Sequence, residues 1–183
     1  MHHPRLAGTY YDMGIKYGTT LRKHGFKLQE LPNKMLTFAG ACEVEVKRVF
    51  PEILDEIHGF SDACKIPYEH LSALIFGVGA FKPPGACSIF AVPTGPDVLV
   101  GRNYDFYYRF KDHLESYFTK PSNGFSSIGD TDIFVGREDG VNEKGLAIAM
   151  AVVKSTEVRP GINFALLVRR VLDKCASVNE ATK

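Results

Sequence analysis

Residues 83–93 read PPGACSIFAVP, and this stretch decides how the chain is organised. Before it, apolar residues recur at helical spacing, whereas after it they alternate or run together as they do in strands. Pro83 and Pro84 end the helical pattern, because proline lacks a backbone N–H and restricts the residue before it. Cys87 then opens the first strand. The sequence therefore predicts an α+β protein whose helical and β segments meet at this cysteine.

Helices are expected before this seam, from residue 9 to about residue 80. Thr9 followed by Asp12 is close to a capping box and marks the start of the first helix. Three further apolar runs follow at helical spacing, the last of them starting at Pro67. Each run places its apolar residues on one face. Such faces need partners, so the segment is predicted to form a helical layer or small bundle.

Two hairpins are expected after the seam. The first joins SIFAV (88–92) to VLVGRNYDF (98–106) through the turn sequence PTGPD. The second joins DIFVGRED (132–139) to GLAIAMAVV (145–153). Between the hairpins, residues 111–130 are polar and rich in Gly and Ser, and we expect a loop or irregular connection there.

Helical spacing returns after Asn163 in FALLVRRVLDKC. Ser177 with Glu180 three residues later then has the pattern of a capped helix start. The sequence stops shortly after this cap. Natural domains seldom end one turn into a capped helix, so we expect the chain to be a fragment.

Composition excludes several classes of function. The chain has 183 residues, 45% of them hydrophobic, and a formal net charge of +1. This near-neutral charge favours neither nucleic acid nor a membrane surface as a partner, and no apolar run approaches a membrane span. The N-terminus has no apolar signal core, so a cytoplasmic location is expected.

Cysteine and histidine placement predicts no metal site and no cofactor. The four cysteines are widely separated without a CxxC pair, and the six histidines form no HExxH motif. Cys42, Cys64 and Cys175 occupy apolar positions of helical patterns, so they are expected to be small core residues. Cys87 differs because it follows a Pro-Gly break and begins a new pattern.

A cysteine in this position has a specific chemical use. If the Ala86–Cys87 bond is cut, Cys87 carries a thiol and an α-amine on one residue. Model α-amines titrate at about 7.7–8.0, so one residue would supply both nucleophile and general base. The thiol can also make the cut itself by an N-to-S acyl shift onto the preceding carbonyl.

The second strand of the first hairpin offers charged partners in GRNYDF. Arg102 is a fixed cation that would favour the thiolate, and Asp105 would hold the α-amine or Arg102. Residues three apart face opposite sides of a regular strand, so we predict a bend or bulge near Gly101–Asn103. Simpler interpretations stay open: Cys87 as a buried structural thiol, and Arg102 with Asp105 as a surface ion pair.

The motifs ACSIFAVP, GRNYDF and DGVNEKGLAIAM, in this order over about residues 85–153, resemble the linear amide C–N hydrolases of the N-terminal nucleophile (Ntn) superfamily. These include choloylglycine (bile salt) hydrolases, penicillin V acylases and acyl-CoA:6-aminopenicillanate acyltransferases. The long helical segment before the cysteine, with AGTYYDMGIKYG near its start, is most similar to the acyltransferase branch. In that branch a long N-terminal segment is severed from the nucleophile autocatalytically.

The resemblance implies a four-layer αββα Ntn-hydrolase sandwich, partial in this chain and preceded by a helical segment. Residues 1–86 would be a propeptide-like leader, and residues 87–183 would be the first part of the sandwich domain, truncated at its C-terminal end. Cys87 would be nucleophile and self-cleavage site, with Ala86 on the other side of the cut. Arg102 and Asp105 would be catalytic residues.

The chain also departs from the family pattern. Bile salt and penicillin V enzymes place an Asn or Tyr where this chain has Val152, so any oxyanion donor there would be the Val152 backbone N–H. A further Asn and Arg of the family are expected beyond Lys183. The family's NEKGL turn, here Asn142 to Leu146, is interpreted as structural.

The predicted function is an autoprocessing cysteine amidase or acyltransferase that acts on non-peptide linear amides through a thioester on Cys87. Its expected partners are a small-molecule amide or acyl substrate, the remainder of its own fold and a second copy in a homo-oligomer. Tyr104 and Tyr107 would line an acyl pocket, although core packing explains them equally well. The alternatives are a Cys87–His113 thiol hydrolase and a catalytically inert protein with the same fold.

Overall fold

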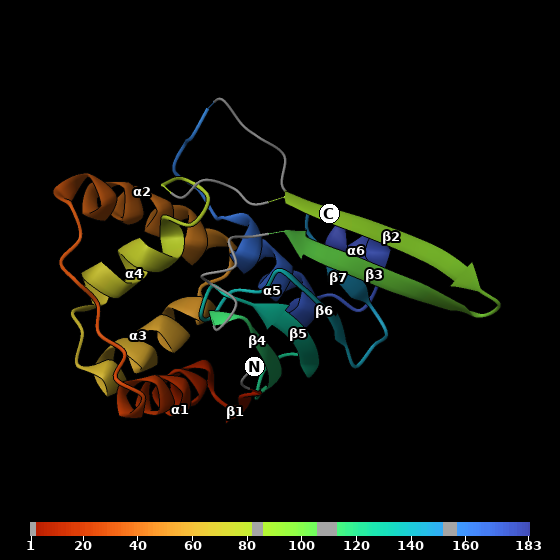
Figure 1. The fold of residues 1–183 in the computed structure, drawn as a ribbon, viewed down its shortest axis with the longest axis horizontal. Helices are drawn as coiled ribbons and strands as arrows, with labels where there is room; N and C mark the ends of the chain where they lie inside the picture. Colours follow the sequence, from red (N-terminus) through yellow and green to blue (C-terminus); the bar gives the residue numbers. More distant parts are fainter. Residues whose placement is uncertain (1–2, 82–85, 106–112, 152–156) are drawn as a thin grey trace.

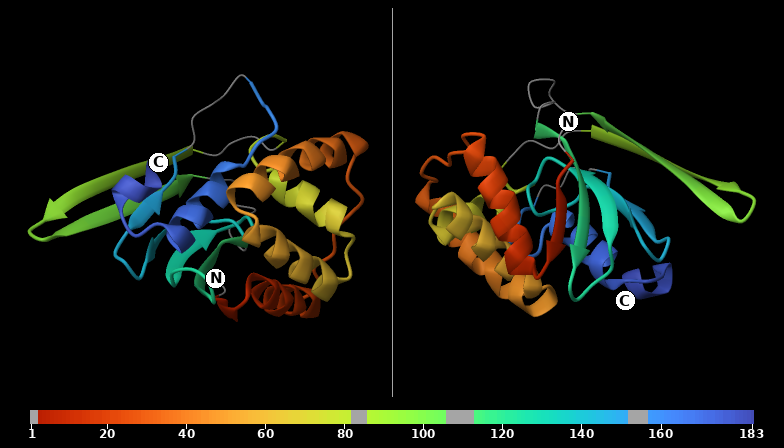
Figure 2. Two further views of the ribbon diagram at one scale, coloured as in Figure 1. Left: turned by 180° about the vertical axis from the view of Figure 1, so that it is seen from behind. Right: turned by 90° about the horizontal axis from the view of Figure 1, so that it is seen from below.

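The computed structural model describes residues 3–81, 86–105, 113–151 and 157–183, which form a mixed α+β fold. In Figure 1, helices α1–α4 gather at one end, a five-stranded sheet lies in the middle, and a two-stranded ribbon extends from the other end. The two further views in Figure 2 show the same ribbon projecting away from the rest of the molecule. The predicted α+β class is therefore confirmed.

The helices lie where the apolar spacing predicts them. Those in the described residues are α1 (Tyr10–Lys23), α2 (Asn33–Val49), α3 (Glu52–Cys64), α4 (Tyr68–Phe76), α5 (Phe164–Lys174) and α6 (Val178–Ala181).

Side-chain caps fix three of the helix starts. The Thr9 hydroxyl accepts a hydrogen bond from the Asp12 N–H, and the Asp12 carboxylate accepts one from the Thr9 N–H, both at 3.1 Å. This is the predicted capping box, and its hydrogen bonds lower the pKa of Asp12. The Asn163 and Ser177 side chains cap α5 and α6 by accepting from the Leu166 N–H and the Glu180 N–H.

The larger sheet has the strand order β1-β4-β5-β6-β7. β1 pairs in parallel with β4, and the remaining pairs are antiparallel. The smaller sheet is the predicted first hairpin, formed by β2 and β3. The strand bounds are β1 (Arg5–Gly8), β2 (Ala86–Thr94), β3 (Asp97–Asp105), β4 (Glu115–Pro121), β5 (Ser127–Thr131), β6 (Asp139–Asn142) and β7 (Ala147–Ala149).

The expectation of a loop over residues 111–130 is wrong, because β4 and all but the last residue of β5 lie within it. Polar residues occupy buried strand positions here. Thr119 and Ser127 are both buried, and their hydroxyls hydrogen-bond to each other at 3.1 Å. A satisfied polar pair can lie in the interior without the desolvation cost of an unpaired group, so polar composition alone misidentified these strands.

The second predicted hairpin is present as β6 and β7, but its first strand does not extend over 132–138. The chain turns there instead, with Phe134 at φ +50° and the Arg137 N–H donating to the Ala165 carbonyl at 3.0 Å. This route places the Arg137 side chain in the interior, over the Tyr117 ring. Part of the second predicted strand lies outside the described residues.

The N-terminal helices and the sheet share one hydrophobic core. Buried residues of α1–α4 pack in the same cluster as Tyr117 of β4, Val135 and Leu166 of α5. Cys42, Cys64 and Cys175 are buried, as predicted for core residues, and burial raises the pKa of each thiol. The helical segment is therefore packed against the β portion rather than held apart from it.

A buried ionic network crosses this junction. Arg169 of α5 donates to Glu56 of α3 at 3.0 Å and to Asp173 at 2.8 Å, and the Tyr10 hydroxyl of α1 donates to Asp173 at 2.9 Å. All four side chains are at most 5% exposed. Burial raises the pKa of Glu56, although Arg169 opposes that effect. The network links α1 and α3 to α5 in the interior, where water cannot replace a lost charged partner.

In residues 3–81, 86–105, 113–151 and 157–183, no helix has the length and apolar character needed to cross a membrane.

Candidate active site

The β2–β3 ribbon brings Cys87 and Arg102 onto one face. The ladder pairs Cys87 with Tyr104 and Ile89 with Arg102. Directly opposed residues of an antiparallel pair point to the same side, and every second residue of a strand does so as well. Cys87, Arg102 and Tyr104 therefore share a face of the ribbon.

A polar contact on this face joins the Arg102 guanidinium to the Cys87 thiol. Arg102 Nη2 donates to Cys87 Sγ at 3.3 Å. Cys87 is partly buried, and the Arg102 side chain is only 6% exposed. A partly accessible thiol beside a fixed cation is the environment in which cysteines become nucleophilic, because the cation favours the thiolate.

Contacts on its other edges hold the Arg102 guanidinium in place. Its Nε donates to the Met150 carbonyl at 3.1 Å, and its Nη1 donates to Asp139 Oδ2 at 3.0 Å. The guanidinium also lies over the Tyr104 ring, 4.8 Å from the ring centre. Burial alone would lower the pKa of Arg102, but Cys87, Glu138 and Asp139 outweigh it and raise that pKa. Arg102 is thus charged and links the ribbon to the strands of the larger sheet.

Glu138 is a second carboxyl group beside Arg102. It is 2% exposed, with Oε2 at 3.6 Å from Arg102 Nη1, beyond hydrogen-bonding distance. Burial and the neighbouring Asp132 charge raise the pKa of Glu138 to about 7, and Arg102 only partly opposes this. Asp132 itself accepts a hydrogen bond from the Tyr104 hydroxyl at 3.1 Å. Burial and the charges of Glu138 and Asp132 raise the pKa of Tyr104.

Asp105 lies on the opposite face of the ribbon from the thiol. The predicted bend near Gly101–Asn103 is wrong, because β2 and β3 pair one to one without interruption from Ala86–Asp105 to Thr94–Asp97. Gly101 makes room for the Phe90 ring, which occupies the space that a Cβ at position 101 would need. The glycine therefore serves cross-strand packing rather than a bulge. On its own face, the Asp105 carboxylate accepts a hydrogen bond from the Asn103 side chain.

Other predicted site residues are placed only in part. Ala86 is exposed at the start of β2, and Tyr104 lies between Arg102 and Asp132. Tyr107 and Val152 lie outside the described residues. His113 is exposed just after one of these gaps, so the Cys87–His113 alternative stays a hypothesis.

Sequence reasoning missed Glu138 and Asp139. A signal was available in the run Arg137-Glu138-Asp139, which interrupts an otherwise apolar strand pattern. Charged side chains are rarely buried unless they are paired, so charges inside a core-like pattern point to an internal partner. Among the described residues, no three His, Cys, Asp or Glu side chains are grouped as a metal ion would require.

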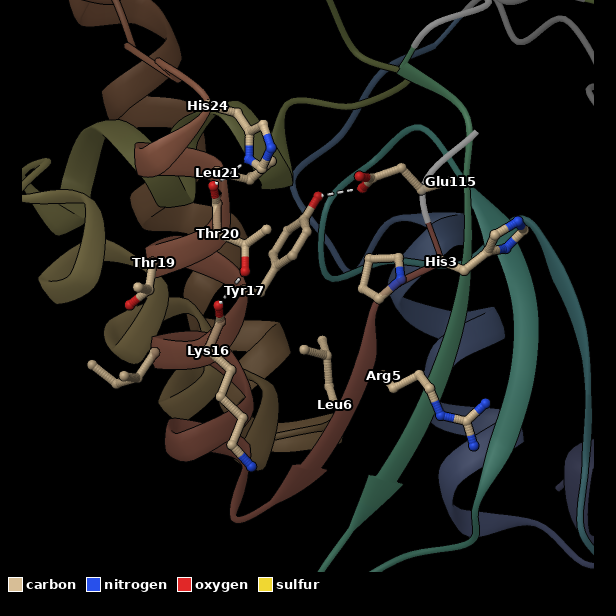
Figure 3. Close-up of a pocket in the computed structure, with 12 residues that line it drawn as sticks. His3, Arg5, Leu6, Lys16, Tyr17, Thr19, Thr20, Leu21, His24 and Glu115 are labelled. Atoms are coloured by element: carbon tan, nitrogen blue, oxygen red, sulfur yellow. Dashed lines mark hydrogen bonds between the residues drawn. The ribbon is translucent and has the colours of Figure 1, made fainter.

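A separate cavity of about 570 Å³ lies between α1, β1 and the start of β4. Figure 3 shows Tyr17 and Glu115 pointing toward one another in it, joined by a hydrogen bond of 2.7 Å. The charged ends of Lys16 and Arg5 lie away from this pair. Burial and the Glu115 charge raise the pKa of Tyr17. The cavity shares no lining residue with the Cys87–Arg102 face.

The comparison with known families points to an Ntn-hydrolase-related family. Residues 93–183 match the family described as acyl-coenzyme A:6-aminopenicillanic acid acyl-transferase. The family resemblance drawn from the motifs is thereby confirmed, and it indicates an acyltransferase or amidase. The match includes Arg102, Asp105 and Asp139, whereas Cys87 lies just before it. No curated protein matches the chain.

Proposed function

We propose that the chain is an autoprocessing cysteine amidase or acyltransferase acting on small linear amides. Cys87 is the nucleophile, and cleavage of the Ala86–Cys87 bond exposes its α-amine. The observation that carries this proposal is the 3.3 Å contact between Arg102 Nη2 and Cys87 Sγ. The Arg102 guanidinium is the cation that would stabilise a thiolate at Cys87. Cys87 lies at the start of a strand, whereas the other three cysteines are buried.

Self-cleavage follows from the chemistry of the thiol. Cys87 Sγ attacks the carbonyl carbon of Ala86, the peptide C–N bond breaks, and the nitrogen of Cys87 leaves as an amine after gaining a proton. Water then hydrolyses the thioester, which gives the Ala86 carboxylate and restores the thiol. Ala86 is exposed, so water can reach this bond.

Turnover repeats the same steps on a substrate. The thiolate attacks the substrate's acyl carbon, the substrate's amine takes a proton and leaves, and the acyl group stays on Cys87 as a thioester. Water or a second amine then removes it. The new α-amine of Cys87 acts as the general base, and Arg102 stabilises the thiolate.

Asp105 is proposed to bind this α-amine. Its Cα lies across the ladder from that of Ala86, next to the bond that is cut. An α-amine belongs to the backbone, in the plane between the two faces of the ribbon. A carboxylate on one face and a thiol on the other can therefore both serve Cys87 without a bend in the strand.

The ribbon is proposed to belong to the four-layer αββα sandwich, with residues 1–86 as the leader and 87–183 as part of the sandwich domain. Phe90, Val98 and Leu99 are between 56% and 61% exposed, on both faces of the ribbon. Exposed apolar side chains on both faces are what a strand pair inside a layered β structure presents before its neighbouring layer is in place.

Intact-mass measurement of the purified chain tests the proposal. We expect fragments 1–86 and 87–183 from the unsubstituted chain and from His113→Ala, but an uncut Cys87→Ala chain. Release of p-nitroaniline from N-acyl p-nitroanilides should likewise require Cys87 and survive the His113 substitution. Amide hydrolysis that persists in Cys87→Ala would overturn the proposal, and hydrolysis lost in His113→Ala would favour the Cys–His alternative.

A further inference from the structure

We propose that Asp139 is a positioning residue that holds Arg102 on the Cys87 thiol. This inference rests on the proposed role of Cys87. Asp139 stands at the first position of β6, and its Oδ2 accepts from Arg102 Nη1 at 3.0 Å. Its other oxygen, Oδ1, accepts from the Asp130 N–H at 3.1 Å. A backbone amide thus orients the carboxylate, the carboxylate orients the guanidinium, and the guanidinium faces the thiol.

The geometry separates Asp139 from the other charged groups around Arg102. Glu138 lies 3.6 Å from the same nitrogen, and its Oε2 has no hydrogen-bond partner. Asp132 bonds to Tyr104 rather than to Arg102. Asp139 is therefore the carboxylate that makes a directional bond to the guanidinium.

Removing the Asp139 charge has two effects of opposite sign. The lost negative charge would by itself favour the thiolate, because like charges repel. Asn has one acceptor oxygen for the two donors that Asp139 binds, so either the bond from Arg102 or the bond from the Asp130 N–H is lost. Either loss frees Arg102 to move from the thiol, which disfavours the thiolate. Coulomb interaction falls with distance, and Arg102 is 3.3 Å from Sγ while Asp139 binds the other guanidinium nitrogen, Nη1. The loss of Arg102 should therefore dominate, so Asp139→Asn should make the thiol less reactive.

Alkylation of Cys87 by iodoacetamide near about pH 7 tests this, since the thiolate is the reacting species. We expect Asp139→Asn to slow alkylation about tenfold, toward the rate of Arg102→Met. Asp139→Glu should recover part of the rate, because it restores a carboxylate. Glu138→Gln is the matched control: it removes a carboxyl group beside the same nitrogen without removing a hydrogen bond to Arg102, and should not slow alkylation.

Peptide mass spectrometry gives the rate separately for cut and uncut chains, so only chains of the same form are compared. Cys42 is 1% exposed and serves as an internal reporter, because its alkylation rises only if the variant loosens. An Asp139→Asn chain that reacts as fast as the unsubstituted chain, or faster, would overturn the inference. The alkylation rate requires neither cleavage nor turnover. It can therefore contradict the inference about Asp139 while the proposed function stands, and it can support the inference while cleavage and turnover fail.

Discussion

Asp105 lies directly across from Ala86 in the β2–β3 ladder, on the face of the ribbon that the Cys87 thiol does not occupy. Arg102, by contrast, shares the thiol's face and contacts it. Under the proposed function, the two charged residues of GRNYDF would therefore act on different atoms of the same cysteine. Arg102 serves the sulfur, and Asp105 is proposed to serve the nitrogen once the bond is cut.

This division predicts different phenotypes for the two residues. Asp105→Asn should leave iodoacetamide alkylation of uncut Cys87 within about twofold of the unsubstituted rate, but reduce amide hydrolysis at least about tenfold, because the α-amine loses its partner. Arg102→Met should slow both. The two rates, measured on one preparation, check the prediction. Equal losses of alkylation in both variants would contradict it.

Glu138 should make stability fall as pH rises. Its pKa is raised from 4.5 to about 7, so the folded chain keeps this proton longer than the unfolded chain. The stabilisation is fully present below about pH 4.5 and is lost as pH rises through about 7, by on the order of 3 kcal/mol at most. Glu138→Gln has no such proton. Urea unfolding at about pH 5 and about pH 8 should show the two proteins' stability difference changing by about 2 to 3 kcal/mol, and a constant difference would disprove the assignment.

Breaking the buried network should be costly. Glu56→Gln leaves Arg169 with one carboxylate fewer in a fully buried site, and we expect a loss of about 3–5 kcal/mol in unfolding free energy. Glu45→Gln is the control, because Glu45 pairs with Arg48 on the surface and should change stability by less than about 1 kcal/mol. Urea denaturation of both variants measures the contrast. Similar small losses would mean that the network contributes little to the junction between α3 and α5.

Gly14 should not tolerate a side chain. A Cβ at Gly14 of α1 would overlap the Glu56 carbonyl oxygen of α3, and backbone cannot easily move away. We expect Gly14→Ala to cost about 3 kcal/mol. Gly40 of α2 has open space around it, so Gly40→Ala should stabilise the protein by about 0.5–1 kcal/mol. Thermal or urea unfolding should therefore move in opposite directions for the two substitutions.

The helices could be predicted because their signals are local. Thr9 and Asp12 are three residues apart, and apolar spacing within each helix needs no distant partner. β1 and β4 are different, since β1 is a four-residue strand whose partner lies more than a hundred residues later. The buried Thr119–Ser127 pair shows the same limit: two polar residues read as surface until the strand pairing that buries them is known.

The candidate site shows the same contrast between local contacts, which could be predicted, and distant contacts, which could not. Cys87 and Arg102 were expected together because a hairpin with an evident turn sets their register. Asp139 could not be paired with Arg102 from sequence, because the two lie in different sheets and no turn connects them. The prediction of a bend was wrong because it assumed that Arg102 and Asp105 must both lie on the face of the ribbon that carries the Cys87 thiol.

The parallel pairing of β1 with β4 means that the proposed cut would change how the protein refolds. β1 precedes the Ala86–Cys87 bond and β4 follows it, so the sheet draws its strands from both sides of the break. An intact chain assembles this sheet in a first-order process. Once severed, the two pieces would have to find each other by diffusion, and recovery from urea would depend on protein concentration. Maturation would thus make refolding slower at low protein concentration, because the two fragments must associate before the sheet can form.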